Sequence, residues 1–203
     1  MIKNIIFDMG NVLIKYDPKH FIARTGIEDA GDRELLFREI FCSEDWALAD
    51  AGQIDEAELF HRICLRVPEK LHRYVHELVF HWNEPIEPIP GMADFIRECK
   101  KNGFGIYLLS NASVRQGEYW PKVPGSECFD GRIVSGDVKC VKPETEIFQK
   151  LIHRYGLIPE ECVFIDDVAA NVDGARRFGM QGIVFEGDMD AFRLLFSKTI
   201  GNA

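Results

Sequence analysis

The stretch IIFDMGN at residues 5–11 decides the fold of this chain. Its run of large apolar residues predicts a short buried strand over residues 3–8, and such strands are typical of a parallel sheet covered by helices on both faces. The run ends at Asp8, and Gly10 follows closely. Because open α/β sheets build their binding sites at the carboxyl ends of the strands, Asp8 is the first candidate site residue.

Three later segments also place residues suited to chemistry after apolar runs. Each run is short enough for a buried strand and stops at, or shortly before, a polar residue. In a parallel sheet these polar residues would share one edge. They are Ser110 and Asn111 after a predicted strand at 106–109, Lys142 after a loop that follows residues 133–134, and Asp166 and Asp167 after a predicted strand at 163–165.

The segment between the first strand and the rest of the sheet has a different pattern. From residue 18 to 87 the apolar residues follow helical spacing, as Leu71, Val75 and Leu78 do, and no strand pattern occurs. A connector with three prolines at residues 84–91 ends this segment. After the connector, helical and strand patterns alternate, which indicates parallel strands joined by helices.

These patterns predict an α/β fold with a doubly wound, Rossmann-like parallel sheet. The core would comprise residues 1–17 and 88–203, with a final strand at 183–185. An all-helical cap at residues 18–87 would be inserted after the first strand. Since that strand ends at the carboxyl edge of the sheet, the insertion would stand over this edge as a lid.

Composition limits the classes of partner and compartment. The net charge of −9 argues against nucleic acid and anionic membranes as main partners, so an anionic substrate would need local positive charge. No apolar run approaches the roughly 18 residues of a membrane span. The six cysteines form no C-x-x-C pair, which favours reduced packing residues in a cytoplasmic protein. We expect a monomer or weak homodimer with a small-molecule partner.

Each candidate residue also has a purely structural interpretation, because turns and helix starts use the same residue types. The structural roles to weigh are a turn cap for Asp8, a helix cap for Ser110, an exposed position for Lys142 before a helix starting at Pro143, and a cap for the helix 172–178 at Asp167 or Asn171. Four such motifs at four successive strand ends are far less expected by accident, which favours a shared site.

The combination suits chemistry on a phosphate ester. An aspartate such as Asp8 can attack phosphorus and form an aspartyl-phosphate. Together with Asp166 and Asp167 it would form an oxygen-rich cluster that needs a cation, and Mg²⁺ prefers such ligands. The Lys142 ammonium would offset negative charge, and the hydroxyl and amide of residues 110–111 would bond the phosphoryl oxygens.

Taken together, the four motifs resemble those of the haloacid dehalogenase superfamily, in their usual order. The resemblance covers essentially the whole chain, because the helical insertion lies where the C1 cap of that superfamily lies. Within the superfamily the chain is most similar to the bacterial sugar-phosphatase branch that includes α-D-glucose-1-phosphate phosphatase. Three stretches carry this finer similarity: FDMGNV at residues 7–12, YWP at 119–121 and FIDD at 164–167.

The resemblance implies a role for each matched residue. Asp8 would be the nucleophile and a ligand of a Mg²⁺ cofactor, and Gly10 would supply a backbone carbonyl to the metal. Asp167 would be the direct acidic ligand, with Asp166 as a second ligand or as a partner of the ligands. The phosphoryl group would be held by Ser110, Asn111 and Lys142.

Gly10 departs from the pattern of many phosphatases in the superfamily, which carry a second Asp two residues after the nucleophile. That Asp protonates the leaving oxygen and then activates water, and a missing acid or base typically costs about 10²–10⁴-fold in rate. A water, a substrate hydroxyl or a cap residue such as His20 could substitute. The acid and the base therefore stay unassigned.

These observations lead to three function hypotheses. The first is a magnesium-dependent phosphatase that hydrolyses a small sugar phosphate or similar metabolite through an aspartyl-phosphate. The second is a 2-haloacid dehalogenase, which uses the same nucleophile without metal and is disfavoured by the acidic pair 166–167. The third is a catalytically weak regulatory protein that binds a phospho-ligand, supported only by Gly10. Tyr16 and Trp46 could stack on a sugar ring, although aromatic residues more often pack internally.

Overall fold

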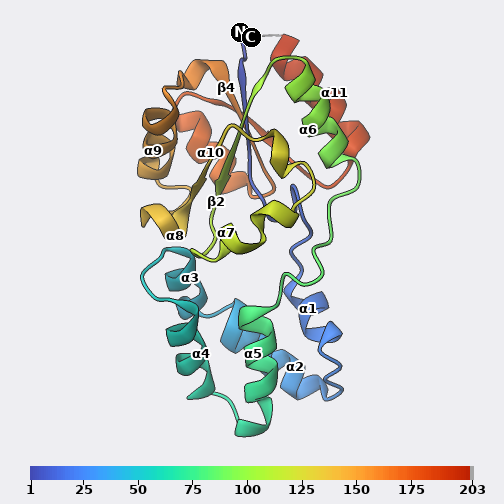
Figure 1. Ribbon diagram of the computed structural model, residues 1–203, viewed down its shortest axis with the longest axis vertical. Helices are drawn as coiled ribbons and strands as arrows, with labels where there is room; N and C mark the ends of the chain where they lie inside the picture. The colour runs from blue at the N-terminus through green and yellow to red at the C-terminus, as the bar shows by residue number, and fades with distance from the viewer. Residues whose placement is uncertain (202–203) are drawn as a thin grey trace.

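The computed structural model describes residues 1–201, and a parallel five-stranded sheet forms the centre of its upper part (Figure 1). The strand order is β3-β2-β1-β4-β5, so the chain extends the sheet from β1 first to one side and then to the other. The predicted doubly wound α/β fold is confirmed. The strands are β1 (Asn4–Phe7), β2 (Gly105–Ser110), β3 (Gly131–Val134), β4 (Cys162–Asp166) and β5 (Gln181–Val184).

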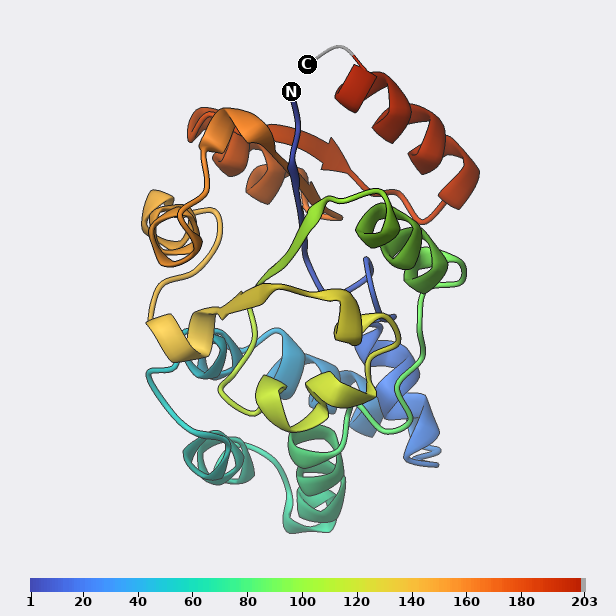
Figure 2. The same ribbon diagram turned by 45° about the horizontal axis from the view of Figure 1, so that its top comes forward.

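Helices cover both faces of the sheet, because successive side chains of each buried strand point to opposite sides. The helices in this part are α6 (Met92–Lys101), α7 (Gln116–Tyr119), α8 (Ser135–Val138), α9 (Thr145–Tyr155), α10 (Ala169–Arg177) and α11 (Met189–Gly201), with 3₁₀ turns at Trp120–Lys122, Ser126–Cys128 and Pro159–Glu161. Ile5 and Phe7 pack with residues of α6 and α11, whereas Ile6 packs with residues of α9 and α10. Figure 2 shows α6 and α11 on one side of the sheet and α9 and α10 on the other.

Between β1 and α6 the described chain forms helices and loops, as its periodicity predicts. The elements are α1 (Pro18–Arg24), α2 (Ala30–Leu36), η1 (Phe37–Phe41), α3 (Glu44–Asp50), α4 (Glu56–Cys64), η2 (Glu69–Leu71) and α5 (His72–Phe80). Asp55 is the N-cap of α4, since its carboxylate accepts a hydrogen bond from the Glu58 N–H at 2.8 Å. Leu36, Ile63 and Val75 are buried in a hydrophobic cluster that belongs to these helices.

Figure 1 shows this helical layer at the end of the molecule opposite the chain termini, where the strands end. Gly52, with φ of +65°, lies so close to the core that a Cβ on it would be 2.1 Å from the carbonyl oxygen of Gly136. Beside this contact, the Ser135 hydroxyl donates to the backbone carbonyl of Asp50 at 2.5 Å. The loop after α3 is therefore seated directly on α8.

Two structural interpretations of the sequence motifs are wrong. Helix α9 begins at Thr145 rather than at Pro143, and Lys142 is only 4% exposed. Helix α10 begins without a side-chain cap, so neither Asp167 nor Asn171 caps it. All of these polar groups are consequently left for other contacts.

The helices and the cysteines can be compared with the expectations from composition. None of the helices in residues 1–201 has the length and apolar character required to span a bilayer. All six cysteines are free. Cys99, Cys140 and Cys162 are buried, in line with a packing role, whereas Cys42 is exposed and Cys64 lies between these extremes.

Candidate active site

The sheet brings the polar ends of its three central strands together. β1 lies between β2 and β4 and pairs with both in parallel. Asp8 directly follows β1, while Ser110 is the last residue of β2 and Asp166 the last of β4. Residues more than 150 positions apart in the chain are therefore neighbours at one edge, as the pattern of apolar runs predicts.

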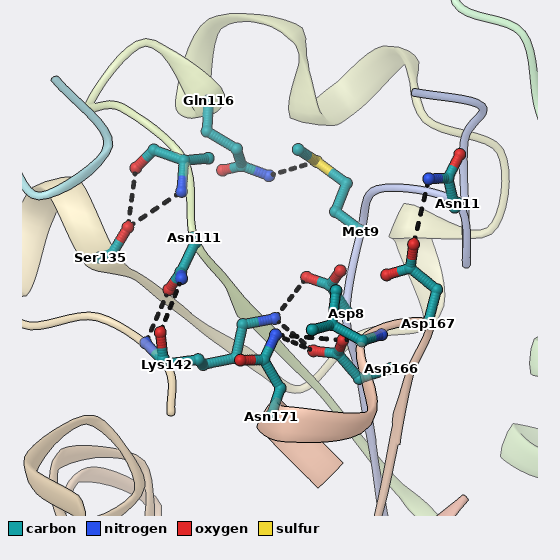
Figure 3. A network of polar contacts seen from close by, with 12 residues as sticks. Asp8, Met9, Asn11, Asn111, Gln116, Ser135, Lys142, Asp166, Asp167 and Asn171 are labelled. Atoms are coloured by element: carbon teal, nitrogen blue, oxygen red, sulfur yellow. Dashed lines mark hydrogen bonds and ion pairs between the residues drawn. The ribbon is translucent and has the colours of Figure 1, made fainter. Parts of the chain in front are cut away.

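Lys142 connects two of these strand ends. Its Nζ atom lies 2.7 Å from Asp8 Oδ1 and 2.7 Å from Asp166 Oδ2, as Figure 3 shows. The side chains of Lys142, Asp8 and Asp166 are 1%, 12% and 0% exposed. Burial lowers the pKa of Lys142, but the two carboxylates together raise it by more. The net shift is upward, so the side chain keeps its positive charge.

The pKa of Asp8 is raised above that of an ordinary aspartate. Burial raises it to about 6, Lys142 opposes the increase, and the neighbouring charge of Asp166 adds to it. One ammonium therefore does not offset all the negative charge at this point. Oxygen atoms of Asp8, Asp166 and Asp167 lie within 4.8 Å of one another. This donor set, consisting only of carboxylate oxygens, fits a hard divalent cation such as Mg²⁺.

The two adjacent acids after β4 have different surroundings. Asp166 is completely buried and accepts hydrogen bonds from the Val168 N–H at 2.8 Å and from Asn171 Nδ2 at 3.1 Å, in addition to Lys142. Asp167 is only partly buried, and burial raises its pKa. Asp167 thus has more free oxygen capacity, whereas Asp166 is occupied in holding Lys142.

Asn11 and Asn171 are site residues that sequence reasoning did not identify as such. Asn11 has a left-handed backbone, with φ of 53°, and its Nδ2 donates to Asp167 Oδ2 at 3.0 Å while its Oδ1 accepts from the Tyr16 N–H at 2.9 Å (Figure 3). Asn171 fixes Asp166 from the first turn of α10. The available signals were weak, because an Asn beside a glycine and an Asn near a helix start are common in turns.

Asn111 has a different contact from the one that the motif predicts. Its Oδ1 accepts from the Lys142 N–H at 2.8 Å, and its Nδ2 donates to the Lys142 carbonyl at 3.1 Å. The Asn111 amide therefore positions the backbone of Lys142, and Asn111 also lines the cavity. Ser110 is 1% exposed and lines the cavity beside Asp8, as expected.

A cavity of about 300 Å³ opens above these strand ends. Its floor includes Asp8, Ser110 and Lys142, and the helical layer supplies the opposite wall. The wall residues are Tyr16, Trp46, Ala49, Asp50, Glu56, Leu59, Val79, Trp82 and Asn83. The size suits a small metabolite rather than a polymer.

Among the residues expected from the cap, Tyr16 and Trp46 reach this cavity and His20 does not. Tyr16 also packs edge-on against Trp82, with ring centroids 5.3 Å apart, so its position has a packing role too. His20 Nε2 lies 2.9 Å from Glu87 Oε1 at the surface. The suggestion that His20 replaces the missing acid is therefore wrong for this arrangement.

The family of the chain follows from a comparison with known protein families. A model of the haloacid dehalogenase-like hydrolases matches residues 2–179. The chain belongs to this family. Its superfamily assignment from the four motifs is thereby confirmed, and the parallel sheet described above is the fold of solved family members.

Similar proteins illustrate the range within the family. A phosphorylated carbohydrates phosphatase of Thermotoga maritima is 26% identical over 88% of this chain and 82% of its own length. Drimenol cyclase drtB of Aspergillus calidoustus is 27% identical over 91% of this chain, which spans only 34% of the cyclase. A family enzyme from Bacteroides thetaiotaomicron, solved with magnesium and inorganic phosphate, has a TM-score of 0.69 and 24% identity and covers 96% of this chain and 99% of its own.

Proposed function

We propose that this protein is a magnesium-dependent phosphatase that hydrolyses a small phosphorylated metabolite through an aspartyl-phosphate on Asp8. The observation that carries the proposal is the Lys142 ammonium, held 2.7 Å from both Asp8 and Asp166 at the floor of the cavity. A buried cation beside a carboxylate nucleophile offsets the charge of an incoming phosphoryl group. Phosphoryl transfer depends mainly on such positioning and charge neutralisation.

The metal would be held by Asp8, Asp167 and the backbone carbonyl of Gly10, with Asp166 acting through its contacts to Lys142 and Asn171. Asp167 is the favoured acidic ligand because its oxygens have fewer partners than those of Asp166. When bound, Mg²⁺ supplies charge neutralisation for the phosphoryl oxygens. Ser110 would donate its hydroxyl to the same group, while Asn111 keeps Lys142 in place.

A sugar phosphate or a similar metabolite is the proposed substrate class. Tyr16 and Trp46 contribute aromatic surface to the cavity, which polar side chains also line. The named activity of the Thermotoga maritima relative supports this class. We also propose that residues 18–87 act as a C1-type cap over the core 1–17 and 88–203, and that the chain belongs to the branch with α-D-glucose-1-phosphate phosphatase.

The test is hydrolysis of 4-nitrophenyl phosphate with Mg²⁺ and after its removal by a chelator. The wild-type protein should be active only with the metal, and Asp8→Asn should lose more than about 10³-fold in kcat/KM, because the acceptor oxygen is no longer nucleophilic. Asp173→Asn, an exposed change on α10, is the matched control and should behave as wild type. Full activity in Asp8→Asn, or in chelator, would contradict the proposal.

Two further measurements distinguish the alternative functions. Chloride release from 2-chloropropionate without metal would indicate a 2-haloacid dehalogenase. Tight phosphate binding without turnover of any ester would indicate a regulatory phospho-ligand binder. The cluster of three carboxylates argues against the first of these, since carbon–halogen displacement by Asp8 needs no cation site.

A further inference from the structure

The proposed reaction lacks an acid–base residue in the first motif. Gly10 has no side chain that could transfer a proton, and His20 faces Glu87 at the surface. Two carboxyl groups do line the cavity without belonging to the floor, and both come from the helical layer. They are Asp50, the last residue of α3, and Glu56, the first residue of α4.

Asp50 is held in place from both sides of the cavity. Its backbone carbonyl accepts a hydrogen bond from the Ser135 hydroxyl of the core. The Ser113 backbone N–H, after β2, and the indole of Trp46, one turn earlier on α3, act on its carboxyl group and lower its pKa. The Ser135 bond anchors the end of α3 to the core, and the Asp50 side chain lines the cavity between the helical layer and the strand ends.

Glu56 is less available for proton transfer. It is 7% exposed, and the Ser113 hydroxyl donates a hydrogen bond to its Oε1. This bond links α4 to the loop after β2 and accounts for the burial of the Glu56 carboxylate. Its negative charge also acts on Asp50.

We propose that Asp50 is the acid–base residue that replaces the missing carboxyl group at Gly10. The inference rests on the phosphatase function proposed above. It stands on the cavity that Asp50 shares with Asp8, on the Ser135 bond that anchors the Asp50 backbone to the core, and on the bond from the Ser113 hydroxyl that engages Glu56, the other carboxyl group that the described helical layer contributes to the cavity wall.

The two half-reactions balance with this one group. First, Asp8 Oδ forms a bond to phosphorus and the bond from phosphorus to the leaving oxygen breaks. The proton of the Asp50 carboxyl group passes to that oxygen, which leaves as an alcohol. Second, water attacks phosphorus, the Asp8–phosphorus bond breaks, and the Asp50 carboxylate takes a proton from the water. Inorganic phosphate leaves, and both aspartates return to their starting states.

The protonation of Asp50 agrees with this role. Burial and the nearby charge of Glu56 raise its pKa to about 8, against the opposing hydrogen bonds from Ser113 and Trp46. The Asp50 carboxyl group is thus protonated at neutral pH, but its pKa is close enough to neutral pH for the carboxylate to serve as a base. The titratable groups that face it are Glu56 of α4, Asp8 after β1, Tyr16 before α1 and Tyr119 of α7.

The experiment compares two leaving groups in wild type and Asp50→Asn with Mg²⁺. The first substrate is the alkyl phosphate that wild type hydrolyses fastest in a panel of sugar and polyol phosphates. The second is 4-nitrophenyl phosphate, whose leaving oxygen needs no proton. Asp50→Asn should lose about 10²–10⁴-fold in kcat on the alkyl ester. On the aryl ester it should release a burst of about one nitrophenolate per active site, followed by slow turnover, because only dephosphorylation now lacks its base.

Matched variants and a pH series complete the design. Glu44→Gln, an exposed change on the same helix, should behave as wild type. Asp50→Glu should recover part of the alkyl phosphatase activity. In wild type, kcat on the alkyl ester should decline above about pH 8 as Asp50 loses its proton. The kcat of Asp50→Asn should not show this decline. Circular dichroism and melting temperature verify that each variant is folded.

Three results would overturn the assignment of Asp50. One is turnover of the alkyl ester by Asp50→Asn within about threefold of wild type. Another is an equal loss on both esters without a burst, which would mean that Asp50 only holds the substrate or the cap. The third is a wild-type protein that hydrolyses aryl but no alkyl phosphates. Failure of the phosphatase function itself is distinct, because wild type would then be inactive on all esters or Asp8→Asn would be active.

Discussion

At the scale of single residues, the site depends on a buried lysine between two carboxylates. Lys142 could not be placed there from its own sequence context, which also fits an exposed position before a helix. Its burial is stabilised because Asn111 binds its backbone and because Asp8 and Asp166 bind its ammonium. Such pairs contribute little net stability, but the loss of one partner leaves charge buried without compensation.

Lys142→Ala should therefore destabilise the protein strongly. In the absence of divalent metal we expect a loss of about 3–5 kcal/mol in the free energy of unfolding, measured by urea denaturation. Lys3→Ala is the matched control, because Lys3 forms an exposed pair with Glu161 and should cost at most about 1 kcal/mol. A Lys142→Ala protein as stable as Lys3→Ala would show that the buried carboxylates need no cation.

At the scale of elements, the contact between the α3–α4 loop and α8 sets the position of the wall residues. The chain turns at Gly52 with a positive φ, and the absence of a Cβ lets it touch the backbone of Gly136. Asp50 and Glu56 flank this turn, so the same contact places both carboxyl groups at the cavity. The close seating of this loop on α8 thus depends on one glycine.

Gly52→Ala should lower activity more than it lowers stability. The new Cβ would lie 2.1 Å from the Gly136 oxygen, so the helical layer must move away from the core. We expect a loss of at least about tenfold in kcat/KM for the phosphate ester, since a small misplacement of catalytic groups has such effects.

Gly26→Ala is the control for Gly52→Ala. It has a similar φ of +74° but nothing within 4 Å of its Cβ position. It carries the same backbone strain of about 1 kcal/mol without the steric contact. Equal kcat/KM values for the two variants would contradict the role of the Gly52 contact.

At the scale of the whole molecule, the helical layer and the sheet have separate hydrophobic clusters, and residues of both parts line one cavity. The net charge of −9 would repel an anionic substrate, so the local cations at the cavity must oppose the overall field. Lys142 and Arg115 both line the cavity. With three carboxylates beside Lys142, the proposed phosphate substrate would need a further cation to bind well.

Millimolar Mg²⁺ should accordingly raise the melting temperature of the metal-free protein. A free Mg²⁺ concentration of about 100 times Kd stabilises the folded state by about 2.7 kcal/mol. For a chain of this size, each kcal/mol raises the melting temperature by about 2–4 °C. Asp167→Asn should abolish most of this increase, whereas Asp173→Asn should retain it. The same increase in Asp167→Asn as in wild type, read by differential scanning calorimetry, would place the metal elsewhere.

The amino-acid sequence by itself determined the elements and the edge of the sheet that carries the site. Apolar runs of strand length, helical periodicity and helix caps are local, so the parallel sheet, the helical insertion and the candidate residues Asp8 and Asp167 follow from them. Their meeting at one edge also follows, because parallel strands end on the same side.

Only the tertiary structure decided which side chains touch. Asn11 bonds Asp167 across 156 positions, and Asn111, which lines the cavity, also bonds the backbone of Lys142. Asp50 reaches the cavity because its helix is seated on the core at Gly52. Such contacts depend on how distant segments pack, and no local periodicity records that packing. The carboxyl group that is missing at Gly10 could therefore be sought in the wall of the cavity only once the fold was known.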